Sequence, residues 1–231
     1  TLRTDFGVNA TSREVVALAS PRVHFSNFRH RDIMAGADFG YVLLVFAMVT
    51  SAYGVFAALL SRVLVHRQLF LSARMAATLT ALLVVGASVV LWSLFLERDF
   101  TVGYVARNSS HDLPFFYTLT AFWAALEGSH MLWTLMLVIF CAVAHWTYAA
   151  DNELIMPFVS AALLSVVTWM LWLATTSSNP FAMQFPAPPD GSGMNALLQN
   201  AYMAIHPPTL FVGYTALSVP WAYALGALAY G

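Results

Sequence analysis

The amino-acid sequence predicts an all-α integral membrane protein with about five transmembrane helices and a long external loop that carries a short surface helix. Two observations support this fold class. The 231 residues are 60% hydrophobic and only 9% charged, whereas roughly a quarter of the residues in a typical soluble domain are charged. Charge-free apolar stretches also recur along the chain, at the length of about 20 residues that spans a bilayer as a helix.

The elements follow from these stretches. The third apolar region, residues 115–148, is too long for one crossing and contains Glu127 and His130, so we expect its beginning to lie at or above the membrane surface. Residues 1–37 contain five arginines and are expected to form a polar N-terminal tail. The expected membrane helices lie within residues 38–231, at about 41–60, 75–96, 128–148, 154–175 and 208–231.

The connections between the helices differ in length and charge. Residues 62–74 carry three arginines and no acid, which is typical of a cytoplasmic loop. The arginines of the tail favour the opposite orientation by the same rule. Residues 176–207 form a proline-rich segment of 32 residues, far longer than a helix connection requires. Such a loop either carries function or acts as a slack linker.

Charge and cysteine content exclude several functions. All 10 basic residues are arginine, and the formal net charge is -1, so no general attraction to nucleic acid is expected. Cys141 is the only cysteine of the sequence, which argues against a disulfide framework, a thiolate zinc site or a Cys-x-x-Cys redox motif. A bound metal or haem would need histidine, methionine or carboxylate ligands.

His206 is the first candidate ligand. Apolar residues recur with helical spacing over residues 194–205, which predicts a short helix lying on the membrane surface. Pro207 and Pro208 are expected to end this helix and to direct the imidazole just above the last span. An imidazole in that position could be an axial ligand of haem iron. The alternative is that His206 only caps the loop by hydrogen bonding.

Glu127 and His130 are the second candidates. An acidic residue within an apolar segment is costly unless it faces a cavity, a partner or the interface. Because His130 follows three residues later, the two side chains share a helix face. Such a pair could relay a proton, bind a cation or merely satisfy each other. Proton or ion transport is the weaker hypothesis, because transport usually needs charged residues deeper in the bundle.

The outer segments also contain linked motifs. Upstream are Asp99-Phe100-Thr101-Val102, Asn108-Ser109-Ser110 and Glu127-Gly128-Ser129; downstream are Thr176-Ser177-Ser178-Asn179-Pro180-Phe181, Pro188-Pro189-Asp190-Gly191 and Ile205-His206-Pro207-Pro208. In order and spacing they resemble the N-terminal part of CcmF, the haem lyase family of cytochrome c maturation. The resemblance covers about residues 40–231.

This resemblance implies a protein that handles haem b as its substrate at the bacterial inner (plasma) membrane or the mitochondrial inner membrane. The long loops would then face the periplasm or the intermembrane space. In the family, two external histidines supply the axial ligands, and His206 falls on the first of them. The implied partners are the haem chaperone CcmE, apocytochrome c, whose Cys-x-x-Cys-His thiols receive the haem, other cytochrome c maturation proteins and the lipid bilayer.

The chain departs from the family pattern at two places. Leu126 stands where the family usually has a histidine before Glu127-Gly128-Ser129, and His130 follows four residues later. The tryptophan-rich segment and the second external histidine have no counterpart in this sequence. We therefore expect the remainder of the lyase to come from the same longer chain or from a separate subunit. The alternative function is a non-catalytic scaffold subunit derived from a haem lyase.

Overall fold

The computed structural model describes residues 22–147 and 154–231. It separates into two units, Thr1–Ala35 and Gly36–Gly231, and the features discussed below belong to the second. No β-strand is formed in the described ranges, where one isolated bridge joins Val102 to Met183. The helices are α1 (Arg22–Val63), α2 (Arg67–Glu97), α3 (Gly103–Asn108), α4 (Phe115–Thr120), the 3-10 turn η1 (Ala121–Trp123), α5 (Leu126–Thr147), α6 (Met156–Thr176), the 3-10 turn η2 (Ala196–Leu198) and α7 (Ala201–Tyr230).

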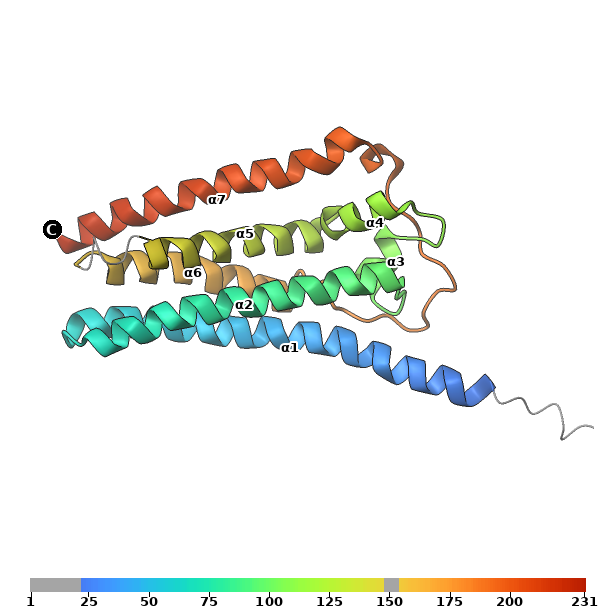
Figure 1. The fold of residues 1–231 in the computed structure, drawn as a ribbon, viewed down its shortest axis with the longest axis horizontal. Helices are drawn as coiled ribbons and strands as arrows, with labels where there is room; N and C mark the ends of the chain where they lie inside the picture. Colours follow the sequence, from blue (N-terminus) through green and yellow to red (C-terminus); the bar gives the residue numbers. More distant parts are fainter. Residues whose placement is uncertain (1–21, 148–153) are drawn as a thin grey trace, which may run out of the picture. The chain divides into compact units, whose positions relative to one another are not determined.

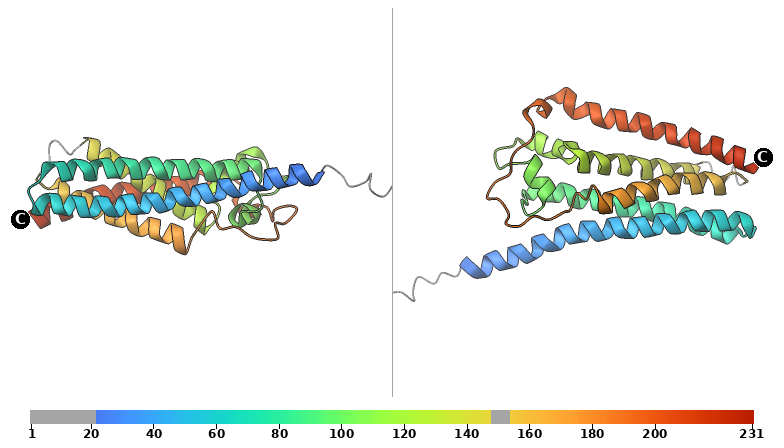
Figure 2. Two further views of the ribbon diagram at one scale, coloured as in Figure 1. Left: turned by 90° about the horizontal axis from the view of Figure 1, so that it is seen from below. Right: turned by 180° about the vertical axis from the view of Figure 1, so that it is seen from behind.

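Five helices in the described part are long and apolar enough to cross a membrane, namely Gly36–Val63 of α1 together with α2, α5, α6 and α7. This confirms the predicted fold class. The helices run side by side (Figures 1 and 2). The end of α1, the start of α2, the end of α5 and the start of α6 lie together at one end of the bundle, and α3, α4 and the long loop lie at the other.

Small side chains allow the spanning helices to approach each other closely. Alanine is the most frequent residue on the buried face of α2, where Ala73, Ala77 and Ala81 are examples. In α1, a Cβ added to Gly54 would lie only 2.7 Å from a methyl carbon of Leu164 in α6. Small residues at such contacts are the usual basis of helix packing in a bilayer, because lipid provides little hydrophobic force between helices.

The long loop is attached to the region around α3. The Gln184 N–H donates to the Thr101 carbonyl at 2.8 Å, and the Gly103 N–H donates to the Ala182 carbonyl at 2.9 Å. Farther along, the Ser192 N–H donates to the carbonyl of Ala106 at 2.7 Å. The loop is therefore packed against the end of the bundle that carries α3 and α4 and is not a slack linker.

The start of α7 differs from the prediction. Residues 194–205 do not form one surface helix that ends at Pro207 and Pro208. They contain the turn η2, and α7 then begins at Ala201 and continues through both prolines. Asn200 starts the helix, because its side chain accepts a hydrogen bond from the Tyr202 N–H at 2.9 Å.

The prolines are tolerated because their cost is partly compensated. A proline at position 208 removes the N–H that would bond to the Ala204 carbonyl. In the structure that carbonyl accepts a hydrogen bond from the indole N–H of Trp123 at 3.1 Å. A tertiary contact thus overrides the local preference on which the prediction depended.

Candidate functional site

His206 lies in the first turns of α7, at the end of the bundle that carries the long loop, and its side chain is exposed. Within the described residues the imidazole forms no hydrogen bond or ion pair. Its backbone carbonyl accepts a hydrogen bond from the Thr209 hydroxyl at 2.8 Å. The alternative that His206 caps the loop through its ring therefore has no support in these contacts, and the ring nitrogens are free to bind a ligand.

The helix face that carries His206 is apolar and open. Tyr202, one turn earlier, is 83% exposed, and Leu210, one turn later, is 43% exposed. A Cβ added to Gly213, on the same face, would meet nothing within 4 Å. A free imidazole within an open apolar surface fits one side of a haem, which is a flat, largely apolar molecule with a metal that accepts nitrogen ligands. The described residues contain no group of three or more potential metal-ligating His, Cys, Asp or Glu side chains.

Pro207 and Pro208 follow the ligand candidate within the helix. Both are half-buried, and Pro207 lines a small cavity together with Trp123 and Met194. Their fixed φ angles stiffen the backbone on the C-terminal side of His206, and the Trp123 hydrogen bond holds the N-terminal side. The position of His206 is therefore determined by α7 and by its contact with the η1 turn.

Glu127 forms an ion pair with an arginine of a different helix. Its carboxylate accepts a hydrogen bond from Arg107 of α3 at 2.6 Å, with exposed side-chain fractions of 22% and 55% for Glu127 and Arg107. His130 instead contacts the Ser178 hydroxyl through Nδ1, and its Nε2 is buried without a hydrogen-bond partner. Although Glu127 and His130 share one helix, the structure gives them different partners and does not form the expected Glu-His pair.

The glycine next to Glu127 is required by close packing. A Cβ on Gly128 would lie 1.7 Å from the Phe122 carbonyl oxygen and 2.1 Å from the Tyr104 hydroxyl. That hydroxyl donates toward the carbonyls of Ala121 and Phe122 at 3.2 and 3.1 Å. Burial raises the pKa of Tyr104 above its ordinary value, so the phenol keeps its proton and its donor role.

Sequence reasoning missed a contact between two outer loops. The backbone N–H of His111 donates to the Asp190 carboxylate at 2.9 Å, and its ring Nδ1 lies 3.0 Å from the same oxygen. The hydrogen bond from that N–H holds the pKa of Asp190 below its ordinary value. Since the two residues are far apart in the sequence, no local pattern could have paired them.

The fold is that of a multi-pass α-helical membrane protein, and its similarity to known proteins is to those of cytochrome c biogenesis. Residues 123–230 match the profile of a family described as Cytochrome C assembly protein. In the solved structure titled Cytochrome c Heme Lyase CcmF, the matching part covers 84% of this chain and 30% of the other, with a TM-score of 0.74 and 30% sequence identity.

Curated relatives agree with the structural match. The cytochrome c-type biogenesis protein CcmF of Escherichia coli is 38% identical over 168 residues, which are 69% of this chain and 25% of the relative. The CcmF of Pseudomonas aeruginosa is 39% identical over 141 residues, which are 58% of this chain and 20% of the relative. The chain is of the CcmF type, and it spans about a fifth to a quarter of the length of these relatives.

Proposed function

We propose that this chain forms the N-terminal membrane part of a cytochrome c haem lyase and holds haem at the outer face through His206. The observation that supports the proposal most directly is the exposed imidazole of His206, which lacks a hydrogen-bond partner in the described residues and lies within an open apolar helix face. The resemblance of Ile205-His206-Pro207-Pro208 and the linked motifs to the CcmF pattern provides the second line of support.

The contribution of this chain is positional. Haem, the substrate, supplies the vinyl groups, and each apocytochrome thiol adds its sulfur and hydrogen across one vinyl double bond, so that no external oxidant or reductant is consumed. A ring nitrogen of His206 would bind the iron, while Asn200, Trp123 and the two prolines keep the backbone of that turn in place. Fixed orientation of the reacting groups lowers the barrier without acid-base chemistry from this chain.

The proposal includes partners and a location. The second axial ligand and the tryptophan-rich surface would come from the remainder of the lyase, on the same longer chain or on a separate subunit. CcmE would deliver the haem, apocytochrome c would receive it, and other cytochrome c maturation proteins would complete the assembly. The outer end would face the periplasm of a bacterium or the intermembrane space of a mitochondrion. Haem contact by Glu127 and His130 stays a prediction; the Nε2 of His130 is buried and has no hydrogen-bond partner in the described residues.

The test is a reduced-haem absorption spectrum of the chain purified with its native partners. His206→Ala should abolish the axial ligation, and His206→Met should retain haem with an altered spectrum, because a thioether is also an axial ligand of haem iron. His111→Ala is the matched control, since it removes an exposed imidazole from the same end of the bundle.

An unchanged spectrum in His206→Ala, with the partner present, would refute the ligand assignment. The scaffold function would then be the better account, because a subunit that only packs against its partners is indifferent to this substitution.

A further inference from the structure

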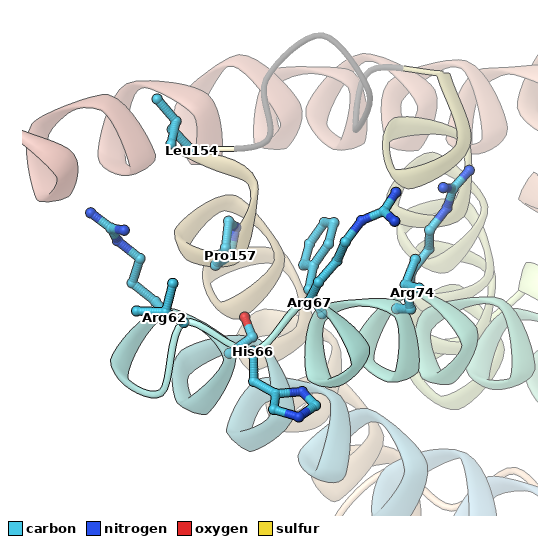
Figure 3. A pocket seen from close by; sticks show the side chains of 10 residues that line it. Arg62, His66, Arg67, Arg74, Leu154 and Pro157 are labelled. Atoms are coloured by element: carbon cyan, nitrogen blue, oxygen red, sulfur yellow. The ribbon is translucent and has the colours of Figure 1, made fainter.

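A basic pocket lies at the end of the bundle opposite to His206. It has a volume of about 310 Å³, at the lower limit of small-molecule sites, which are about 300–1,000 Å³. Its charged lining comes from Arg62 at the end of α1 and from Arg67 and Arg74 in the first turns of α2. Figure 3 shows these three side chains extending on the side of the α6 start, whereas the His66 imidazole points the other way.

The positive charge of the pocket is uncompensated in the described residues. Neither ion pair found in residues 36–147 and 154–231, whose side chains the structure describes, includes Arg62, Arg67 or Arg74. Two of these arginines are held by aromatic rings, because the guanidinium of Arg74 lies 4.0 Å from the centre of the Trp146 ring and that of Arg62 lies 5.3 Å from the centre of the Tyr230 ring. Such contacts orient a guanidinium and leave its in-plane N–H donors available.

Two further donors point to an anion. The Nε of Arg74 is buried and has no hydrogen-bond partner. The pocket also contains the start of α2, a helix of 31 residues whose first turn has no acidic residue and whose N-cap, His66, forms no side-chain cap. The Leu69 N–H of this turn donates to the His66 carbonyl at 3.0 Å, and N–H groups that stay unpaired at a helix start favour a negatively charged ligand.

The remaining walls indicate that the anion belongs to a lipid. Phe70, Leu71, Leu154 and Pro157 provide an apolar lining beside the arginines. The pocket also lies where two spanning helices, Gly36–Val63 and Arg67–Glu97, end and begin, which is the level of lipid headgroups. A glycerophospholipid combines a phosphate with acyl chains and therefore matches both parts of the lining.

We propose that this pocket binds the phosphate of an anionic glycerophospholipid, with Arg62, Arg67 and Arg74 as the donors and the apolar wall against the upper acyl chain. Arginine is suited to this role because its planar N–H groups pair with two phosphate oxygens at once. The site is distinct from the haem site proposed above, since it lies at the other end of the bundle and shares no residue with it.

The test is native mass spectrometry of the full chain in detergent, titrated separately with dioleoyl phosphatidylglycerol and with dioleoyl phosphatidylcholine. We expect phosphatidylglycerol to bind more tightly. Loss of one arginine near the headgroup layer should weaken binding about fivefold, so Arg62→Gln/Arg67→Gln should weaken it about 25-fold. The affinity of Arg62→Lys/Arg67→Lys for phosphatidylglycerol should lie between those of the parent chain and the glutamine variant, because lysine retains the charges and loses the bidentate geometry.

The matched control is Arg98→Gln/Arg107→Gln, which removes two positive charges from the opposite end of the bundle and should leave the lipid preference unchanged. Equal weakening in the control would overturn the proposal in favour of diffuse charge attraction, as would equal binding of the two lipids by the parent chain. Displacement of phosphatidylglycerol by an equal concentration of inorganic phosphate would show a soluble-phosphate site and overturn the lipid assignment. Should the glutamine variant fail to fold by circular dichroism, the lysine variant and the competition experiment still decide the question.

The acidic residues Asp151 and Glu153, which precede Leu154 in the sequence, lie outside the described residues. Their double variant Asp151→Asn/Glu153→Gln tests whether these neighbouring carboxylates compete with a lipid for the arginines. Binding of phosphatidylglycerol by the parent chain supports the proposal. Binding that occurs only in this double variant would show that the arginines serve these carboxylates and would overturn it.

Discussion

Replacing Trp123 with phenylalanine tests whether the start of α7 depends on the indole that reaches the Ala204 carbonyl. The substitution keeps an aromatic ring and removes the donor of the 3.1 Å hydrogen bond. Ala204 is 4% exposed, so water cannot replace that donor. A buried carbonyl left unpaired costs about 1–3 kcal/mol, and side-chain hydrogen bonds measured in a membrane protein reach at most about 1.7 kcal/mol. We expect a loss of about 1–2 kcal/mol in unfolding free energy.

The second half of this test uses Pro208. Pro208→Ala restores the backbone N–H that an uninterrupted helix would direct at the Ala204 carbonyl. In that background Trp123→Phe no longer leaves the carbonyl without a donor, so its cost should fall by about 1 kcal/mol, which is a typical coupling energy for residues that share one partner.

The assay is denaturant unfolding of the detergent-solubilised chain, followed by far-UV circular dichroism so that loss of a tryptophan does not affect the signal. Trp92→Phe is the matched control, because it removes an indole hydrogen bond of the same length to the Leu119 carbonyl, where no proline intervenes. The loss of unfolding free energy caused by Trp92→Phe should be the same in the parent chain and in Pro208→Ala. An equal cost of Trp123→Phe in both backgrounds would refute the reasoning and assign Trp123 a packing role only.

Three further predictions concern the outer end. Gly128→Ala should lower the unfolding free energy by about 3 kcal/mol or more, because its Cβ would lie 1.7 Å from a backbone carbonyl oxygen. Gly213→Ala is the control, because a Cβ there meets nothing within 4 Å. This control should keep or raise the thermal stability. Glu127→Gln should cost less than about 1 kcal/mol, since its ion pair is partly exposed, and a cost unaffected by salt would contradict this account. The lowered pKa of Asp190 stabilises the fold at a pH above the unfolded-state pKa of about 4, and this stabilisation is lost as the pH falls through the folded-state pKa. The unfolding free energy, measured from about pH 6 to 2, should therefore fall less in Asp190→Asn than in the parent chain. Identical curves for the two proteins would exclude this contribution.

Hydropathy was sufficient to predict the spanning helices, because a bilayer imposes a length and an apolar composition on each crossing. The prediction that Pro207 and Pro208 end a helix failed. The sequence shows that their N–H groups are missing, but it does not show the distant indole that compensates for one of them. It also paired Glu127 with the wrong neighbour. Helical spacing indicated His130, but the carboxylate lies against Arg107, on a different helix. His206 was expected just above the last span, but it lies within the first turns of the spanning helix α7.

The attachment of the long loop to the α3 region depends mainly on backbone groups, as in the bonds from Gln184 to Thr101 and from Ser192 to Ala106. Backbone donors and acceptors are the same for every residue except proline, which lacks the donor. Most single substitutions in residues 182–192 therefore leave these bonds intact, while an insertion or deletion between the two anchor points shifts them out of register. During divergence many side chains of this loop can change, whereas Gly191, whose added Cβ would lie 2.0 Å from the Ser109 carbonyl oxygen, and the length between Gln184 and Ser192 are constrained.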